Sequence, residues 1–506
     1  MKQLHRLITG LLGSILFVNP VMAAEGGNTN LNALFGVING WLESVFFFDI
    51  LFFTDSASFP FIVAWLIAGA VYLTLRMGFI NFRVMRHAIE IIRGKYTRPE
   101  ATGEVTPFQA LTTALSATVG LGNIAGVAIA ISQGGPGAVF WMILAGLLGM
   151  TTKFTEATLA QKYREVRPDG HVMGGAMEYL ARGLSEKGFN KTGKYLAILF
   201  CLLTIGASFG AGNAFQVSQS LTAVKQDITI FATQSWLYGV IMAFFVGIVI
   251  IGGIKRIAHT ASAIVPSMVV IYLLACIWII LSHATEIPRI IGLIFTEAFT
   301  LDAGLGGLLG VIIIGFQRAA FSSEAGVGSA AIAHSTARTI YPVRQGIVAL
   351  MEPFIDTVVI CTMTALVILI TGVYTDAQYM HLAQNNHGAA LTSVAFGSVI
   401  SWFPIILSIS VVLFAYSTMI SWSYYGERCW AYMFGERSSI IYRIIFVIFI
   451  VIGSVTSATN ILGFSDLMVL AMAFPNIVAL YVLSGTVKRE LDEYLSKLRQ
   501  GEFVKN

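Results

Sequence analysis

The sequence predicts an all-α protein that crosses a lipid bilayer many times, and three properties of the chain support this fold class. Hydrophobic residues make up 56% of its 506 residues and charged residues only 11%, whereas soluble domains carry about 25% charged residues. The mean hydropathy is +0.77. Apolar runs near the length of about 20 residues that a helix needs to cross a bilayer recur along the chain. The net charge of +4 is too small to indicate nucleic acid as a partner.

Residues 1–24 have the layout of a secretory signal peptide. A basic start leads into an apolar stretch, and Val21-Met22-Ala23 offers a small-residue cleavage site. An uncleaved anchor helix is the alternative. The next segment, 25–58, is expected on the external, periplasmic side, and its part 31–53 is typical of an amphipathic helix at the membrane interface.

Eleven apolar runs then predict membrane-spanning helices. The first is peripheral, and the cytoplasmic amphipathic loop that follows it extends this unit over residues 59–107. The predicted spans are 59–77, 108–131, 137–161, 195–222, 235–252, 259–282, 303–333, 344–371, 402–425, 439–457 and 465–486.

The distribution of Lys and Arg indicates the orientation. If the first span runs from outside to inside, 26 of the 31 Lys and Arg residues fall on the cytoplasmic side, and only Lys225 and Arg289 lie in external loops. Cytoplasmic loops of membrane proteins carry such an excess of cations. We therefore expect the mature N-terminus and the loop 283–302 outside, and the C-terminal tail 487–506 in the cytoplasm as a short charged helix.

Residues that disfavour a helix interrupt the span 108–131. Gly120-Leu121-Gly122-Asn123 follows a series of small polar residues, and two glycines in so short a stretch weaken a helix. Backbone groups freed in mid-membrane are tolerated only where protein or water satisfies them. An unwound stretch here would offer carbonyl groups to a cation and the N–H groups of the next half-helix to a carboxylate. Close helix packing through Gly122 and Gly126 is the alternative.

The span 303–333 carries a second candidate break. Arg318 and Glu324 lie within an apolar run, and a charge costs a few kcal/mol at the bilayer centre, so both side chains must face protein or water. We expect an unwound stretch at 321–324. A purely structural pair or clamp of the two charges is the alternative.

The span 402–425 combines many hydroxyls with no charge. Adjacent Ser417 and Thr418 offer two oxygens that suit a hard monovalent ion. Alone, this signal is weak, because Ser and Thr commonly bond carbonyls of their own helix.

The two broken spans occupy corresponding places in the chain. The units 108–282 and 303–486 each contain five spans, so they enter the membrane from opposite sides. This is the pattern of a 5+5 inverted repeat whose first helices are discontinuous, with the span 59–77 outside the repeat.

Five long stretches of this chain form a recognisable set. They are FRVMRHAIEIIRGKY at 82–96, ATVGLGNIAGVA at 117–128, GGPGAVFWMILAGLLG at 134–149, FSSEAGVGSAAIAHS at 321–335 and SWSYYGERC at 421–429. Together they resemble the sodium:alanine (alanine or glycine:cation) symporter family, and the resemblance covers residues 59–486. It implies a leucine-transporter-like fold with one extra N-terminal helix, in a bacterial plasma (inner) membrane. It also implies sodium-coupled uptake of a small neutral amino acid, alanine or glycine, with Na⁺ as the coupling ion and no organic cofactor.

The resemblance also implies which residues bind the amino acid. The backbone amides at Leu121 and Gly122 would hold its carboxylate, and Asn123 would lie near it, with a second ion there as an open possibility. Gln216 and Trp422 could instead serve ordinary helix packing, and Ser323 stands where the family leads us to expect Asn. The implied substrate-binding residues are Gly120, Leu121, Gly122, Asn123, Gln216, Phe321, Ser322, Ser323 and Trp422.

The implied sodium site lies between the first broken span and the span 402–425. It would consist of carbonyl oxygens at Ser116, Val119 and Phe414 and the hydroxyls of Ser417 and Thr418. In the implied mechanism, sodium binds first and stiffens the broken helices, the amino acid follows, and a four-helix bundle rocks to release both inside.

Two other classes of function fit the sequence less well. A channel needs a continuous polar stripe across several spans, and the polar residues here form isolated breaks. An intramembrane enzyme needs a convergent nucleophile, acid or metal set, and the eight histidines lie in loops or near span ends without ligand spacing. The preference for alanine, glycine or serine, the L or D selectivity, the number of ions and the oligomeric state stay open.

Overall fold

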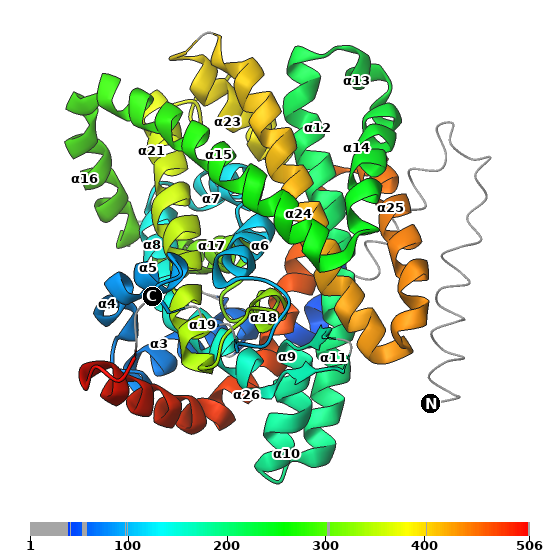
Figure 1. Cartoon of the computed structure of the whole chain (residues 1–506). Coiled ribbons are helices and arrows are strands. Elements are labelled where there is room, and N and C mark those ends of the chain that lie inside the picture. The colour runs from blue at the N-terminus through cyan, green and yellow to red at the C-terminus, as the bar shows by residue number, and fades with distance from the viewer. Residues whose placement is uncertain are drawn as a thin grey trace.

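The computed structural model describes residues 39–503, except 41, 53–57, 97, 99, 169, 301–303 and 401. The predicted signal peptide and most of the segment that follows it lie outside the described residues. The described chain is almost entirely helical (Figure 1). Its two-stranded sheet pairs β1 (Glu165–Val166) with β2 (Val172–Met173) in antiparallel register.

Each predicted span coincides with a helix or a broken helix. In the described residues, eight helices are long and apolar enough to cross a membrane, or nine if one bent pair is a single span. The helices α3 and α14 match two further predicted spans but have only 16 residues each, so the count of eleven stays a prediction. The long helices are α3 (Phe61–Arg76), α8 (Gly137–Tyr163), α11 (Asn190–Phe209), α12 (Phe215–Asp227), α14 (Ser235–Ile250), α15 (Gly253–Ser282), α17 (Gly304–Ser323), α24 (Phe403–Phe434), α25 (Ser439–Val455) and α26 (Ala458–Arg499).

The first predicted break is present. Helix α6 (Pro107–Thr118) ends before Gly120, and a π-helical turn, η1 (Gly122–Gly126), leads into α7 (Val127–Gly134). The two halves meet at an angle of 51°. Gly120 and Leu121 therefore lie in the break, whereas Gly122 and Asn123 already belong to the second half.

The second break lies slightly later than predicted. Helix α17 continues through Ser323, and the non-helical stretch covers 324–330 before the short α18 (Ala331–Ser335). Glu324 has a left-handed φ of 55°, and Gly326 and Gly328 have φ of 88° and 89°. Such angles are incompatible with a right-handed helix and favour glycine. The backbone turns at these glycines, so Phe321, Ser322 and Ser323 are helical rather than unwound.

The span 402–425 corresponds to α24, which is continuous, and Ser410, Ser417 and Ser423 each bond a carbonyl of the same helix. Ser410, for example, donates to the carbonyl of Ile406 at 2.9 Å. The expected tail helix is the continuation of α26, where Lys488–Asp492 and Lys497–Glu493 form ion pairs one turn apart.

Shorter helices and turns connect or interrupt the long ones. They are α4 (Ile80–Arg83), α5 (Met85–Ile92), α9 (Ala176–Glu178), η2 (Tyr179–Gly183), α10 (Leu184–Glu186), η3 (Gly210–Ala214), α13 (Ile230–Thr233), η4 (Ala284–Glu286), α16 (Ile287–Ala298), α19 (Pro342–Ala349), α20 (Met351–Pro353), η5 (Phe354–Cys361), α21 (Thr362–Thr371), α22 (Met380–Gln384), α23 (Gly388–Gly397) and η6 (Glu436–Ser438).

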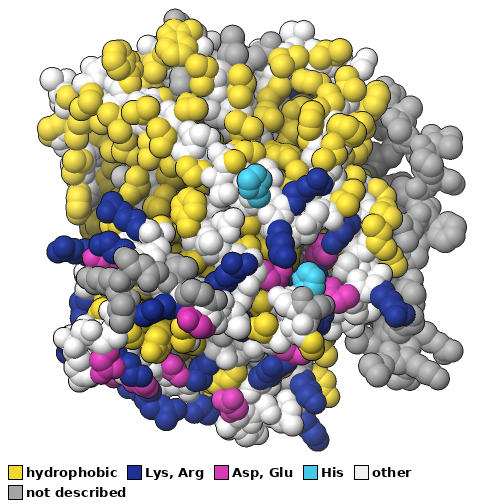
Figure 2. All heavy atoms as spheres, viewed as in Figure 1, with side chains coloured by type: hydrophobic (Ala, Val, Ile, Leu, Met, Phe, Trp, Pro, Cys, Tyr) yellow, Lys and Arg dark blue, Asp and Glu magenta, His cyan; other side chains and the backbone are white. Residues whose placement is uncertain are grey.

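The surface divides into an apolar region and a charged end. Figure 2 shows hydrophobic side chains over the upper part of the molecule and Lys, Arg, Asp and Glu gathered below. Large apolar side chains such as Phe244, Trp278 and Leu281 are more than half exposed, as lipid-facing residues are. We call the lower part, where α10 and the last turns of α26 lie, the charged end (Figure 1).

Candidate functional site

The first break packs directly against α24. Thr418 Oγ1 donates a hydrogen bond to the carbonyl of Ser116 at 3.0 Å, and Ser116 Oγ donates to the carbonyl of Ser417 at 2.7 Å. Ser417 Oγ in turn donates to the carbonyl of Phe414 at 3.0 Å. A Cβ atom on Gly120 would lie 2.3 Å from Thr418 Oγ1, so a glycine is required for this approach.

This cluster consists of neutral oxygens in a buried place. The structure brings Ser116, Phe414, Ser417 and Thr418 together, and Val119 ends α6 beside them with ψ of 80°, outside the helical range. The resemblance implied that carbonyls of an unwound helix, together with hydroxyls, bind the sodium ion. The donor set therefore fits the predicted ion.

The amides of the first break already have partners. The N–H of Gly120 donates to Asn123 Oδ1 at 3.0 Å, and the N–H of Leu121 donates to Gln216 Oε1 at 3.1 Å. Gln216 lies on α12 and is held by its own Nε2, which donates to the carbonyl of Ala211 at 2.9 Å. Gln216 therefore lies beside the backbone amides predicted to bind the substrate carboxylate. Its Oε1 already accepts the hydrogen bond of one of them, the N–H of Leu121.

Asp356 joins the two broken spans, and the sequence analysis did not single it out. Its Oδ1 accepts from Asn123 Nδ2 at 2.6 Å, and its Oδ2 accepts from Ser322 Oγ at 2.8 Å and from Thr357 Oγ1 at 2.8 Å. Asp356 is 0% exposed and forms no ion pair within the described residues. Asp356 and Glu352 are the two acids inside the apolar run 344–371, and they were the available signal, because an ionisable residue in a span marks a functional site by default.

The predicted substrate-binding residues of the second broken span divide into two groups. A Cβ on Gly122 would lie 3.4 Å from the Cα of Ser322 and 3.6 Å from the ring of Phe321, so these two residues do face the first break. Ser323 instead donates to the carbonyl of Ala319 at 2.9 Å, on its own helix.

Trp422 packs on a different surface. A Cβ on Gly212 would lie 2.3 Å from the Cβ of Trp422, so the tryptophan fills the space left by the π-helical turn η3. Its ring also packs against Tyr425, with centroids 5.5 Å apart.

Arg318 and Glu324 do face the interior, but they do not pair with each other. Arg318 forms an ion pair with Asp466 on α26, and its guanidinium lies over the ring of Phe321 at 5.4 Å. The ring of Phe321 in turn meets that of Phe215 edge-on at 5.1 Å. These contacts cover the first break on the side away from the charged end.

At the charged end, the segments that flank the two broken spans are bonded to each other. The residues Val105 and Ala337 form a parallel bridge, and Arg164 donates to the carbonyls of Ser335 and Ala337, both at 2.6 Å. The same guanidinium donates to the carbonyl of Thr102 at 2.8 Å. Burial lowers the pKa of Arg164 to about 10, which leaves it charged at neutral pH.

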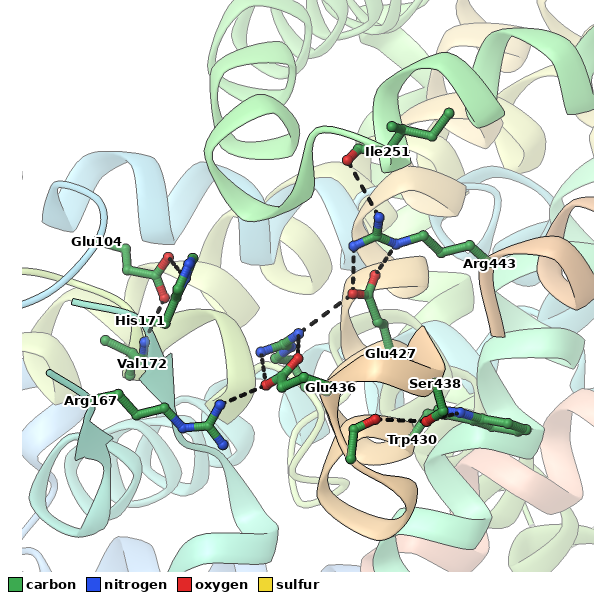
Figure 3. A network of polar contacts seen from close by, with 12 residues as sticks. Glu104, Arg167, His171, Val172, Ile251, Glu427, Trp430, Glu436, Ser438 and Arg443 are labelled. Atoms are coloured by element: carbon green, nitrogen blue, oxygen red, sulfur yellow. Dashed lines mark hydrogen bonds and ion pairs between the residues drawn. The ribbon is translucent and has the colours of Figure 1, made fainter. Parts of the chain in front are cut away.

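A network of ion pairs also links neighbouring segments at the charged end (Figure 3). Glu436 accepts from Arg167 at 3.0 Å, beside the hairpin β1–β2, and from Arg428 at 2.9 Å. Glu427 binds Arg443 at 2.7 Å. The network connects the end of α24 with the loop after α8, so both ends of the predicted site are closed in this structure.

The described polar groups at the breaks bond one another rather than line an open cleft. A cavity of about 30 Å³ lies elsewhere, between Tyr341, Glu490 and Lys497 near the charged end. It contains no group of either break, so it is not the predicted site.

Comparison with known proteins identifies the family. The sequence model of the Sodium:alanine symporter family matches residues 47–506. The chain belongs to the sodium:alanine symporter family. It is therefore a multi-pass membrane transporter, as the sequence predicted.

Relatives and solved structures agree with this membership. The sodium/alanine symporter AgcS of Methanococcus maripaludis is 39% identical over 444 residues, which covers 88% of this chain and 96% of AgcS. The probable sodium/glutamine symporter GlnT of Bacillus subtilis is 35% identical over 445 residues, with coverage of 87% and 89%. The crystal structure of MhsT in complex with L-phenylalanine matches with a TM-score of 0.51 at 14% identity, over 76% of this symporter and 99% of that chain. This last likeness confirms the leucine-transporter-like fold.

Proposed function

We propose that this symporter couples the entry of sodium to the uptake of alanine, with glycine as the nearest competitor. One observation carries the proposal: the two broken helices and α24 bring a neutral oxygen cluster and a buried carboxylate, Asp356, to the same region of the fold. A hard cation suits the cluster, and a zwitterion suits a place that offers N–H groups at a helix N-terminus together with a carboxylate. The names of AgcS and GlnT support sodium and a small amino acid.

The sodium ion binds where Thr418 now donates to Ser116. On binding, the hydroxyls of Ser417 and Thr418 turn their oxygens to the ion, and the carbonyls of Ser116, Val119 and Phe414 complete its shell. The ion thereby ties α6 to α24.

The amino acid binds on the other side of the break. Its carboxylate takes the N–H groups of Leu121 and Gly122, at the positive end of the second half-helix, after Gln216 has moved away. Its ammonium faces Asp356, whose carboxylate has no cation beside it among the described residues. Phe321 and Ser322 close over the small side chain.

Transport requires that the two closures open in turn. We infer that the charged end is cytoplasmic, because the loops that carry most of the Lys and Arg residues lie on that side (Figure 2), and that the C-terminus lies there and the mature N-terminus outside. The pair Arg318–Asp466 then closes the outer side, and Arg164 closes the inner one. A negative membrane potential contributes about 2.3 kcal/mol per 100 mV for each sodium ion that enters.

Uptake by proteoliposomes tests this function. We expect labelled alanine to accumulate against a sodium gradient and not when sodium is replaced by potassium or choline. A panel of unlabelled competitors, namely glycine, serine, glutamine and both enantiomers of alanine, then ranks the substrates. Equal uptake with choline would refute sodium coupling, and stronger competition by glutamine than by alanine would refute the substrate.

A further inference from the structure

A second group of buried ionisable side chains surrounds the non-helical stretch 324–330. Lys153 and Glu156 come from α8, Glu324 from the break itself and Glu352 from α20, and each is at most 2% exposed. We call these four residues the acidic junction. It lies outside the places proposed above for the amino acid and for sodium. Lys153 had been counted among the cytoplasmic cations, and the structure corrects this by burying it.

A single ammonium group serves the three carboxyl groups of the junction. Lys153 Nζ forms an ion pair with Glu352 Oε1 at 2.9 Å, and His334 Nε2 contacts Glu352 Oε2 at 3.1 Å. His334 Nδ1 lies 2.7 Å from Gln345 Nε2. One lysine and one histidine therefore face three buried carboxyl groups, which cannot all be ionised without uncompensated negative charge.

The two carboxyl groups without a cation have different neighbours. Glu156 Oε1 accepts from Asn476 Nδ2 at 2.7 Å, whereas Glu156 Oε2 has no hydrogen-bond partner in the described chain. The hydroxyl of Tyr179 donates to Asn476 and fixes the orientation of its amide. Glu324 accepts from Ser329. Neither glutamate forms an ion pair within the described residues.

Two further polar side chains at this place lack a partner. The hydroxyl of Tyr425, on α24, is 0% exposed, has no hydrogen-bond partner in the described chain, and lies within electrostatic reach of Glu324 and Glu352. Thr152 Oγ1 is equally unpaired, and its methyl group lies 3.8 Å from the position of a Cβ on Gly326. Buried hydroxyls normally find partners, so their presence beside unpaired carboxyl groups indicates a small ligand.

A proton fits this place better than a metal ion. No group of three His, Cys, Asp or Glu side chains within the described ranges is arranged to hold a metal ion. Buried carboxylates without a partner are costly, and one proton removes one charge without needing a coordination shell. The surroundings of Glu156 and Glu324 therefore favour a protonated, neutral carboxyl group while the acidic junction is buried.

We propose that the acidic junction binds an exchangeable proton on Glu156 or Glu324 and that this proton holds the stretch 324–330 in its closed arrangement. The ionisable groups that face the two carboxyls are Lys153 on α8, Glu352 and His334 from the neighbouring segments, Tyr179 from η2 and Tyr425 from α24. When the charged end opens, water reaches the junction. The carboxylic acid then gives its proton to water and becomes a carboxylate, which leaves the break free to move.

Infrared spectroscopy of the full-length protein reads the proton directly, without sodium or alanine. We expect the wild type at neutral pH to show the C=O band of a buried protonated carboxyl group, and Glu156→Gln or Glu324→Gln to lose that band. Glu490→Gln is the matched control, because Glu490 pairs with Lys162 at the surface, and it should retain the band. A wild type without the band, or two folded variants that both retain it, would overturn the proposal.

The pH profile of uptake gives a second measurement, which rests on the proposed function. We expect sodium-driven alanine uptake by the wild type to depend on pH and a folded Glu156→Gln or Glu324→Gln variant to lose that dependence, with Glu490→Gln unchanged. If one variant does not fold, the other decides. An unchanged profile in the folded variants would contradict the proton site, whereas an absence of alanine uptake in the wild type contradicts only the proposed substrate, since the infrared band does not depend on it.

Discussion

The side-chain oxygen Oε1 of Gln216 lies 3.1 Å from the backbone nitrogen of Leu121 and accepts its hydrogen bond. This oxygen occupies the position that we propose for an oxygen of the substrate carboxylate. The amino acid must therefore displace a neutral acceptor that is attached to the protein. The hydrogen bond protects the break when the site is closed, because an unpaired N–H in the bilayer interior is unfavourable.

Gln216→Glu should turn this neutral acceptor into a strong competitor. A carboxylate of the same size accepts a hydrogen bond about twice as strongly as an amide, and as part of the protein it acts at an effective concentration on the order of millimolar. We expect the KM for alanine to rise at least about tenfold, which corresponds to about 1.4 kcal/mol, while the sodium concentration for half-maximal uptake changes less.

Gln219→Glu is the matched control for a new charge on the same helix. Gln219 is buried but bonds Asn386 and Ala389 rather than the break. An equal rise in KM in both variants would show that the charge alone matters. An unchanged KM in Gln216→Glu would remove Gln216 from the carboxylate site.

Thr418→Ala should weaken sodium binding without changing which amino acids compete. The change removes the hydroxyl that now bonds Ser116 at 3.0 Å and that we assign to the ion. We expect the sodium requirement to rise about tenfold, in line with the loss of one ligand worth about 1.4 kcal/mol, and Thr418→Ser to restore it.

The control for this change is Ser421→Ala, one turn further along α24. Ser421 Oγ has no hydrogen-bond partner in the described chain. The sodium dependence of uptake, measured at saturating alanine, distinguishes the variants. A normal sodium dependence in Thr418→Ala would exclude it from the ion site.

The sequence predicted the breaks because their causes are local. Two glycines around Leu121, and two more after Glu324, disfavour a helix wherever they stand in a chain. The position of the second break was predicted a few residues too early. The charged and hydroxyl residues at 318–324 drew attention, whereas the backbone turns at Gly326 and Gly328, which follow them.

Partners of buried charges could not be predicted in the same way. Arg318 pairs with Asp466, which lies 148 residues further along the chain, and Lys153 pairs with Glu352, which lies 199 residues further. Which residues meet depends on how the two five-helix units pack. Lys153 lies inside the predicted span 137–161 and within α8, yet the count of cations assigned it to the basic loop that follows.

Asp356→Asn should reduce alanine binding strongly. The change removes the negative charge proposed to face the ammonium group, and a hydrogen bond to a charged group contributes about 1.5–3 kcal/mol. We therefore expect the affinity for alanine, measured by displacement of the labelled amino acid, to fall by about 10- to 150-fold.

Thr357→Val provides the comparison, because it removes one hydrogen bond to the same carboxylate, at 2.8 Å, and keeps the charge. Its effect on affinity should be several-fold smaller. Equal losses in the two variants would mean that the order of the hydrogen-bond network, rather than the charge of Asp356, determines affinity.

Arg164→Lys should open the charged end. The two terminal nitrogens of the guanidinium bond three carbonyls, one before α6, one on the last residue of α18 and one just after it, and the compact ammonium of lysine cannot span the same positions. We expect the population that is open at this end to increase, so that the proposed site becomes accessible to reagents from the cytoplasmic side.

Cys361 reports this opening, because its sulfur lies 3.4 Å from Asn123 Nδ2 and 3.3 Å from Ser322 Oγ. In a background without the other three cysteines, Arg164→Lys should accelerate the labelling of Cys361 by an impermeant maleimide applied to inside-out vesicles. Arg167→Lys is the control, since Arg167 bonds Glu436 in the ion-pair network at the charged end and not the three carbonyls. Faster labelling should also be suppressed by sodium with alanine. If Arg164→Lys labels at the wild-type rate, the closure does not depend on Arg164.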